Sequence, residues 1–413
     1  LDSNYSAILA QTVMGKGVQE AEGTHEYHGK PISGFEQGLE DLGVENKLEH
    51  YKKLRESNQT TGFQGRPIIK PVINAGARIV YTDKSDCRGA WGKALVNIAN
   101  NTLNSDGSPK KGNSPIAVFD CDLAGSVQTQ GFAKAYPDKF YQAGIQENST
   151  AIIAGTVSTR GISTWVAMFG SFGHGMCYNE HLLTAINDGN LKLVTTHNSI
   201  DVGEDSKTHS PIGYLCLENH PGWDTFVPAD ANQTDAIVRH MATNYGNMHM
   251  PVGRSKIEII KKQNSDEPFF DKEYTFTPEN GCFDKLRDFG NDYVIVTYGT
   301  PTGKAVDAAE KLYEQNINGK VINVPTPTKI SDNILDEISD TKVIVTFEDH
   351  NVNTGIARTL DSKILMSNNP KPEEIIHIGL CGYSKSAPSE HLYKHFGISE
   401  DNLINKIESV LKK

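Results

Sequence analysis

The sequence predicts an α/β fold with two successive parallel-sheet domains, preceded by a shorter segment over residues 1–57. The chain has 413 residues, a length that allows two or three domains with substantial cores. Candidate buried strands alternate with helical segments over 77–262 and again over 284–413, and such alternation indicates crossover connections in a parallel sheet. Loop-rich stretches separate these regions, so we expect linkers at 58–76 and 263–283.

The elements are expected in the following order. In the first segment, residues 6–13 predict a short strand before a Gly-Lys-Gly turn, and residues 34–57 predict a charged helix. In the second region, the expected strands are 114–122, 164–170, 191–198 and 223–230, and the helices begin at Asn148 or cover 179–188 and 232–246. In the third region, the expected strands are 292–299, 319–326, 341–350 and 373–380, and a charged helix over 400–413 follows them.

Charge and composition disfavour several functions. The formal net charge of −11 argues against a nucleic-acid partner, because phosphate contacts require a basic face. No apolar stretch approaches the roughly 20 residues that span a bilayer, and no signal peptide opens the sequence, so we expect a cytoplasmic protein without a membrane partner. The six cysteines are scattered without a C-x-x-C pair, which favours free thiols over a disulfide or zinc framework.

Polar and aromatic residues follow three predicted strands, at the carboxyl ends where parallel sheets collect function. The loop after 191–198 brings histidines and acids together, although a solvated loop also fits. Two acids end the strand 114–122, where a helix cap is the alternative. Two phenylalanines lie among glycines, a pattern that admits a flat ligand but also fits core packing. The candidates are His197, Asp201, Glu204, Asp205 and His209; Asp120 and Asp122; and Phe169 and Phe172.

Glu147 is a fourth candidate. It stands between a Gly-Ile-Gln lead-in and an apolar run over 151–154. An acid in the first turn of a helix is stabilised by the helix dipole, which by itself would explain the residue. No single feature decides between these alternatives, but their order and spacing favour one shared site.

Taken in order, the stretches TDKSDCRGAWGKAL, VFDCDLAGSVQT, AGIQENSTAIIAG, FGSFGHG, HNSIDVGEDSKTH and VPADANQT resemble the pyrimidine-binding domain of the transketolase family. The resemblance covers about 74–262 and continues more weakly through a C-terminal domain to the end of the chain. AILAQTVMGKGV and EYHG resemble the final strand and last loop of the family's diphosphate-binding domain. We therefore expect the end of that domain over 1–57, the pyrimidine-binding domain over 77–262 and the transketolase-type C-terminal domain over 284–413.

The resemblance implies a thiamine diphosphate enzyme that moves a two-carbon ketol unit from a ketose phosphate to an aldose phosphate. Glu147 matches the glutamate that hydrogen-bonds the aminopyrimidine ring of the cofactor, a role that suits a carboxyl group whose pKa burial raises. Phe172 matches the ring that stacks on the pyrimidine, with Phe169 beside it. Asp122 and Leu123 match positions that line the cofactor cleft.

Further matches concern catalysis and the sugar phosphate. His209 and His28 join Glu147 as expected catalytic residues. Arginines suit the phosphate, because a planar guanidinium donates to two oxygens at once. The expected substrate contacts are Arg88, Ser126, His197, Asp205, Arg254 and His28.

Three positions depart from the family pattern. Gly175 stands where an aromatic residue is common, with Tyr178 further along the chain. Gln146 replaces the usual Arg before Glu147, and Asn198 stands where many members have Asp. These departures bear on the third wall of the pyrimidine pocket and on substrate choice.

The residues that hold the metal end of the cofactor are expected outside this sequence. The family anchors Mg²⁺ with a Gly-Asp-Gly motif and a later Asn, whose oxygens suit this hard ion, and no Gly-Asp-Gly occurs here. We therefore expect no metal ligand on the chain, an amino-terminal diphosphate-binding chain or fragment as a partner, and a homodimer of the complete enzyme. A first residue just before an expected strand favours a cut within that domain over a gene split in the linker.

Two other functions stay open. One is a related thiamine diphosphate enzyme, either a deoxyxylulose phosphate synthase or a 2-oxoacid dehydrogenase beta subunit, and the other is a homologue without catalysis. The arginines and His197 favour sugar phosphates over pyruvate. Glu348 and His350, between a strand and a helix of the C-terminal region, are expected to have a structural and dimer-supporting role.

Overall fold

A computed structural model describes residues 9–61, 67–198, 200–209 and 213–412, and the chain divides into two units, Leu1–Pro67 and Ile68–Lys413. The expected strand over 6–13 is wrong in its described part: residues 9–13 are not a strand, since the described residues of this unit offer no strand to pair with them. The expected helix over 34–57 is divided, because the chain turns at Gly43 with φ 64°. The elements of this unit are η1 (His25–Tyr27), α1 (Phe35–Asp41) and α2 (Leu48–Thr61).

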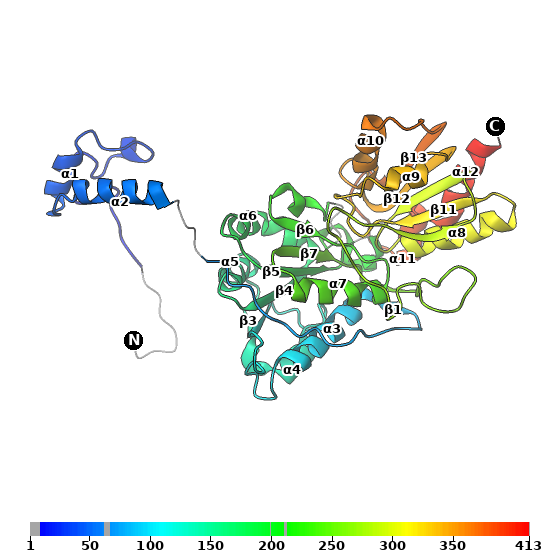
Figure 1. The fold of residues 1–413 in the computed structure, drawn as a ribbon, viewed down its shortest axis with the longest axis horizontal. Coiled ribbons are helices and arrows are strands. Elements are labelled where there is room, and N and C mark those ends of the chain that lie inside the picture. The colour runs from blue at the N-terminus through cyan, green and yellow to red at the C-terminus, as the bar shows by residue number, and fades with distance from the viewer. Residues whose placement is uncertain (1–8, 62–66, 199, 210–212, 413) are drawn as a thin grey trace. The chain divides into compact units, whose positions relative to one another are not determined.

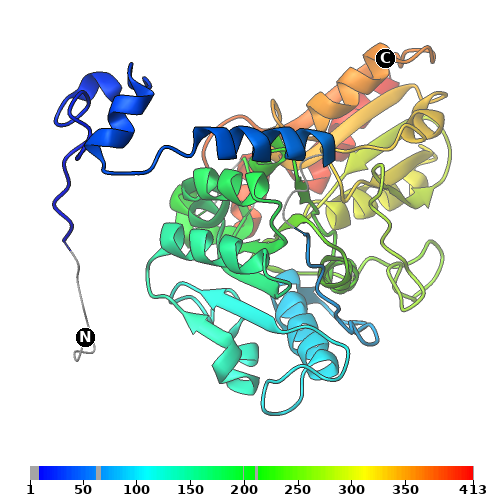
Figure 2. The ribbon, with the colours of Figure 1, turned by 60° about the vertical axis from the view of Figure 1, so that its left-hand side comes forward.

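The second unit is built on two sheets, seen from two directions in Figures 1 and 2. The first has the strand order β3-β2-β4-β5-β7-β6, and all neighbours are parallel, as predicted. Two of its strands were not predicted from the sequence. β3 was not predicted because it is a short edge strand, and β7 because it contains no β-branched residue. The strands are β2 (Ile116–Asp120), β3 (Phe140–Gln142), β4 (Ser163–Phe169), β5 (Leu191–Thr196), β6 (Trp223–Thr225) and β7 (Asn247–Pro251).

Helices cover both faces of this sheet. Val118, Trp165 and Val194 face α3 (Cys87–Thr102), α4 (Gln130–Ala135) and α7 (Ala231–Thr243), with which they form one core cluster. Their neighbours along the strands point the other way, as the pleat requires, and pack against α5 (Glu147–Ser158). Helix α6 (Tyr178–Ile186) packs beside α5.

The second sheet has the order β13-β12-β10-β11-β9, and only the edge strand β9 is antiparallel. Its strands are β9 (Asp284–Asp288), β10 (Tyr293–Thr297), β11 (Gly319–Asn323), β12 (Val343–Asn351) and β13 (Glu374–Leu380). One face packs on α8 (Thr302–Glu314), α11 (Ser389–His395) and α12 (Glu400–Leu411), and the other on α9 (Ile334–Ile338) and α10 (Ile356–Met366). The predicted α/β class with parallel sheets is therefore confirmed.

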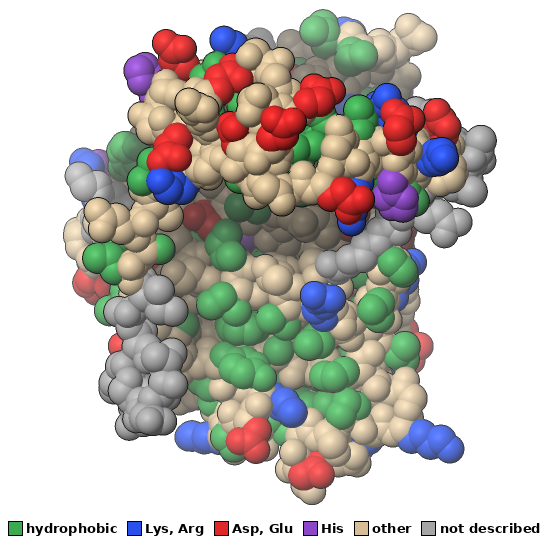
Figure 3. Space-filling view, turned by 90° about the vertical axis from the view of Figure 1, so that its left-hand side faces the viewer, with side chains coloured by type: hydrophobic (Ala, Val, Ile, Leu, Met, Phe, Trp, Pro, Cys, Tyr) green, Lys and Arg blue, Asp and Glu red, His purple; other side chains and the backbone are tan. Residues whose placement is uncertain are grey.

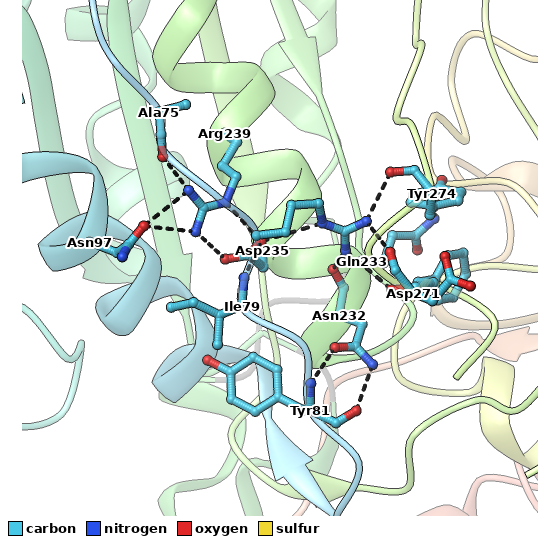
Figure 4. Close-up of polar contacts among 12 residues, drawn as sticks. Ala75, Ile79, Tyr81, Asn97, Asn232, Gln233, Asp235, Arg239, Asp271 and Tyr274 are labelled. Carbon is cyan, nitrogen blue, oxygen red and sulfur yellow. Dashed lines mark hydrogen bonds and ion pairs between the residues drawn. The ribbon is translucent and has the colours of Figure 1, made fainter. Parts of the chain in front are cut away.

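A buried ion cluster holds the extended segment over 67–84 against the first sheet's helices (Figure 4). Asp235 of α7 is fully buried and accepts hydrogen bonds from Arg239 at 2.9 Å and from Arg78 Nε at 3.4 Å. Arg78 also donates to the carbonyl oxygens of Asp271 and Tyr274, at 2.6 and 2.9 Å. The Asp235 carboxylate thus joins α7 to the segment, and the Arg78 guanidinium joins the segment to the loop near residue 271.

Smaller elements complete the unit. A two-stranded sheet pairs β1 (Ser85–Asp86) with β8 (Lys256–Ile257). Across the described ranges, every helix is too short or too polar to span a bilayer. The remaining turns are η2 (Pro137–Lys139), η3 (Ser171–Met176), η4 (Ile200–Thr208) and η5 (Cys216–Asn219).

Candidate active site

Three adjacent strands, β2, β4 and β5, lead into sequence-predicted residues: Asp122 follows β2, Phe172 follows β4 and His197 follows β5. β2 leads into the loop 121–129, β4 into the π-helical turn η3, and β5 into a turn at His197. Because parallel neighbours end at the same edge of a sheet, these three connections lie side by side.

Four rings form the centre of this site. The ring centroid of Phe169 lies 4.2 Å from that of His197 and 5.2 Å from that of His209. The ring of Phe172 lies 6.5 Å from Phe169 and 5.7 Å from His209. The ring planes are inclined to one another by 34° to 82°, and Phe169, Phe172 and His209 are partly exposed, so the cluster offers aromatic faces and edges to a ligand. We call these four residues the ring site.

His197 is neutral at pH 7. Burial, followed by the charges of Arg88 and Arg254, lowers its pKa to about 3. Its Nδ1 lies 2.8 Å from the Thr196 hydroxyl, and its backbone has a φ of 60°, a conformation that a non-glycine residue adopts at a cost. The imidazole is therefore held as an uncharged hydrogen-bonding group in a strained turn, as at many ligand sites.

The charges of two arginines, Arg88 and Arg254, contribute to the lowered pKa of the His197 imidazole. Arg88 donates from Nη1 to the Ser126 carbonyl oxygen at 2.9 Å. Arg254 donates to the Val202 carbonyl oxygen at 2.8 Å and to Asp205 at 3.3 Å. Burial lowers the pKa of Arg88, and the charge of Arg254 adds to this effect. Two cations beside a neutral imidazole make a suitable place for a phosphate group.

The loop after β2 is shaped by Asp120. Its buried carboxylate accepts hydrogen bonds from the Leu123 N–H at 2.7 Å, the Thr129 hydroxyl at 2.6 Å and the Gln142 amide at 3.0 Å. It does not cap α4, which has no side-chain cap. Within the loop, Leu123 packs on the core, and the chain turns at Asp122 with φ 63°; Asp122 and Ser126 are exposed.

Glu147 is the first residue of α5 and is partly exposed. Its charge raises the pKa of both Cys121, after β2, and Cys177, after η3, although burial is the larger cause in each case. The next residue, Asn148, donates to the Met176 carbonyl oxygen at 3.2 Å. Glu147 thus lies between the end of β2 and η3, without the burial expected for its role.

Comparison with known proteins decides the family. The family model "Transketolase, pyrimidine binding domain" matches residues 110–252, and "Transketolase, C-terminal domain" matches 281–403. The chain belongs to the transketolase family. A "Putative transketolase C-terminal section" of Methanocaldococcus jannaschii is 27% identical over 301 residues, which cover 72% of this chain and 91% of that protein. Human transketolase is 24% identical over 419 residues, and the match spans 99% of this chain but 62% of the human protein.

Solved structures agree on the fold. The chain is similar to a structure titled "Split gene transketolase, inactive beta4 tetramer", with a TM-score of 0.66 and 26% identity over 79% of this chain and 99% of that one. It also matches transketolase from Campylobacter jejuni, with a TM-score of 0.70 and 18% identity over 96% of this chain and 62% of that one. The second likeness concerns the fold alone.

The aromatic faces of the ring site could stack on the pyrimidine ring of thiamine diphosphate, the cofactor that the transketolase family generally uses. A Cβ placed on Gly175 would meet no atom within 4 Å, so the space next to η3 is open where the family commonly has an aromatic residue. No group of three or more potential metal-ligating side chains occurs in the part of the chain that the structure describes. The chain therefore has residues that could hold the pyrimidine ring, but none of its described groups fits the metal.

Three further residues, His28, Asp201 and His174, do not belong to the ring site. His28 lies in the first unit, exposed after η1, and its catalytic role stays a prediction. Asp201 accepts hydrogen bonds from the backbone N–H groups of Arg254 at 3.0 Å and Ser255 at 2.7 Å, and so orients Arg254. His174 in η3 was not singled out, because its partners are distant in sequence.

Proposed function

We propose that this chain is the pyrimidine-binding and C-terminal part of a transketolase, which transfers a two-carbon ketol unit from a ketose phosphate to an aldose phosphate. The observation that carries the proposal is the ring site, in which the neutral His197 is under the influence of the charges of Arg88 and Arg254. When bound, thiamine diphosphate supplies the nucleophilic carbon for breaking and making the carbon–carbon bond. The chain itself binds and orients the reactants.

Each predicted residue has a role in this proposal. Phe172 and Phe169 hold the pyrimidine ring by stacking, beside Asp122 and Leu123. Glu147 hydrogen-bonds a ring nitrogen and shares a proton with it. Arg88 and Arg254, with Ser126, hold the sugar phosphate, and the remaining polar groups of this unit contact its hydroxyls: His197, Asp205 and His209. The catalytic and substrate-binding role of His28 is a separate prediction from the family resemblance.

Exposed apolar side chains lie on α5 and α6 and just before the start of each helix. Figure 3 looks onto the side of the molecule on which α5 and α6 lie, and hydrophobic side chains gather there. Soluble proteins rarely leave such a patch uncovered unless it binds a partner. We call the set the α5–α6 patch: Ile145, Ile152, Ile153, Met176, Leu183 and Ile186, with exposed fractions from 41% to 75%.

The partner that we propose for this patch is a diphosphate-binding chain or segment. Glu147 begins the helix that bears two residues of the patch, so a partner seated there would also bury its carboxylate. That burial would supply the environment that the proton-sharing role requires. Mg²⁺ and the diphosphate would be held by the partner, and a homodimer of such pairs would complete the enzyme.

The proposal is tested with the protein purified together with any polypeptide that accompanies it. Supplied with thiamine diphosphate, Mg²⁺, xylulose 5-phosphate and ribose 5-phosphate, the assembly is expected to form a seven-carbon ketose phosphate. Turnover of pyruvate instead would favour a deoxyxylulose phosphate synthase or a 2-oxoacid dehydrogenase. Absence of transfer with these and related sugar phosphates would leave a non-catalytic homologue.

A further inference from the structure

Two unusual turns carry the residues of the ring site. Phe172 lies in η3, a π-helical turn, which is a rare conformation found mostly at functional sites. His197 lies in the turn after β5, with its strained φ of 60°. Such conformations persist only where the surrounding structure holds them.

One hydrogen bond joins these two turns. The side chain of Asn198, next to His197, lies 3.3 Å from Nε2 of His174, two residues after Phe172. The Asn198 amide nitrogen donates to the Thr195 carbonyl oxygen at 2.8 Å and to its hydroxyl at 2.9 Å. Because a carbonyl oxygen can only accept, the orientation of the amide is fixed, and Asn198 Oδ1 faces His174. Nε2 of His174 must therefore carry a proton and donate it.

The other nitrogen of His174 has a matching partner. Its Nδ1 lies 3.4 Å from the Cys216 sulfur. Burial lowers the pKa of His174 to about 3 and raises that of Cys216 to about 11, so the imidazole is neutral and the thiol is protonated at pH 7. Nδ1 is therefore an acceptor for the Cys216 thiol, whose sulfur also lies 3.8 Å from the His174 carbonyl oxygen.

Cys216 also connects the site with the second sheet. It begins η5, and the two residues before it contact β12. The Tyr214 hydroxyl donates to Asp349 at 3.0 Å, and the Tyr214 ring lies 4.7 Å from that of His350. The Leu215 N–H points to His350 Nε2 at 3.4 Å. A continuous set of contacts therefore runs from β12 to His174.

We propose that His174 is a positioning residue. Through Asn198 it fixes the turn that bears Phe172 against the turn that bears His197, and through Cys216 it ties both to the second sheet. We call the two hydrogen bonds of the His174 ring, to Asn198 and to Cys216, the lock. The effect that we expect on cofactor and substrate binding rests on the proposed function, whereas the existence of the lock does not.

The lock is tested first in the 413-residue chain by NMR with ¹⁵N-labelled histidine. His174 should give one protonated nitrogen, Nε2, and one acceptor nitrogen, Nδ1. His197 is the reporter, since the ring current of Phe169 acts on it from 4.2 Å. His174→Leu should move the His197 signals, and His174→Gln, whose amide can replace the Nε2 donor, should move them less. His240→Leu, in a separate aromatic cluster with Phe226 and Phe276, is the matched control and should leave them in place.

The second test uses the complete assembly. His174→Leu should raise the half-saturating concentration of thiamine diphosphate and the KM of the ketose phosphate by about tenfold, because the Asn198 oxygen loses its donor and both turns move. The kcat at saturation should change much less, and His174→Gln should restore most of the loss. A purely structural role would instead lower the active fraction at constant KM.

The outcomes separate the two proposals. An inactive wild-type assembly would contradict the proposed function, and the His197 signals would still decide whether the lock exists. An active assembly in which His174→Leu matches the wild type in KM and in the His197 signals would overturn the inference.

Discussion

Two different roles could explain Glu147: an acid that stabilises the start of a helix, or an acid that shares a proton with the cofactor. Glu147 begins α5, where the helix dipole stabilises an acid, and it lies between the end of β2 and η3 without being buried. An acid that only begins a helix can be replaced without loss of activity, whereas an acid that shares a proton with the cofactor cannot. The two roles can therefore be separated by a substitution that keeps the shape and removes the charge.

Glu147→Gln should lower ketol transfer by the assembly at least about 100-fold, the scale of a lost acid–base group, and leave the unfolding temperature of the chain nearly unchanged. Glu400→Gln is the matched control, because Glu400 also begins a helix of 12 residues. Ketol transfer is measured for both variants. Full activity in Glu147→Gln would remove its assigned role.

At the scale of single residues, the positions of the ring-site residues could be predicted from the sequence, but their supporting contacts and charge states could not. The ordered motifs located Phe169, Phe172, His197 and His209, and the structure places their rings in contact. His174 could not be found in this way, because its role depends on hydrogen bonds to residues 24 and 42 positions away. The neutral state of His197 likewise depends on burial and on arginines that only the fold brings near.

The start of α10 shows how an element depends on a buried acid. Glu348, within β12, accepts hydrogen bonds from the backbone N–H groups of Ile356 at 3.0 Å and Ala357 at 3.2 Å, and from the Tyr298 hydroxyl at 2.7 Å. A Cβ at Gly355 would lie 1.8 Å from the Glu348 carboxylate, so glycine is required there. These contacts support the structural role expected for this motif.

Glu348→Gln should change how stability depends on pH. Burial raises the pKa of Glu348 from 4.5 to about 7. The stabilisation from its proton is therefore fully present below pH 4.5 and is lost as the pH rises through about 7. Glutamine is neutral throughout, so the free energy of unfolding of the variant relative to wild type should increase from acid to mildly alkaline pH by up to about 3 kcal/mol. Denaturant unfolding across this range measures it, and parallel curves would contradict the account.

Removal of the Asp235 carboxylate from the buried ion cluster should strongly lower the free energy of unfolding. Asp235→Ala would leave Arg78 and Arg239 buried without their partner, which should cost roughly 3–5 kcal/mol in the free energy of unfolding. Asp266→Ala removes an exposed pair with Lys261 and should have no measurable effect. Equal stability of the two variants would show that the cluster does not hold the segment 67–84.

At the scale of elements, most strands of the two large sheets could be predicted from their apolar and β-branched residues, whereas β3, β7 and β9 could not. β2, β4, β5, β10 and β12 each contain an apolar run and are buried over nearly their whole length, as expected for strands buried on both faces. β3 and β9 are edge strands, and their sequences contain polar residues. The strand expected over 6–13 depends on neighbours that its described surroundings do not supply.

At the scale of the whole molecule, the α5–α6 patch predicts dependence on a partner. Ile153→Asp should weaken binding of the diphosphate-binding partner at least about tenfold, because a charge would be buried in an apolar interface. Leu365→Asp, on α10 and 78% exposed, is the control and should bind as wild type does. Affinity is measured by titration of the partner into each variant. Unchanged binding of Ile153→Asp would place the interface elsewhere.

The most direct test of the central claim is ketol transfer by the assembly with and without its diphosphate-binding partner. The account predicts that the 413-residue chain alone forms no seven-carbon ketose phosphate from xylulose 5-phosphate and ribose 5-phosphate. Addition of the partner, thiamine diphosphate and Mg²⁺ should produce it. Transfer by the chain alone, or no transfer by the complete assembly, would contradict the account.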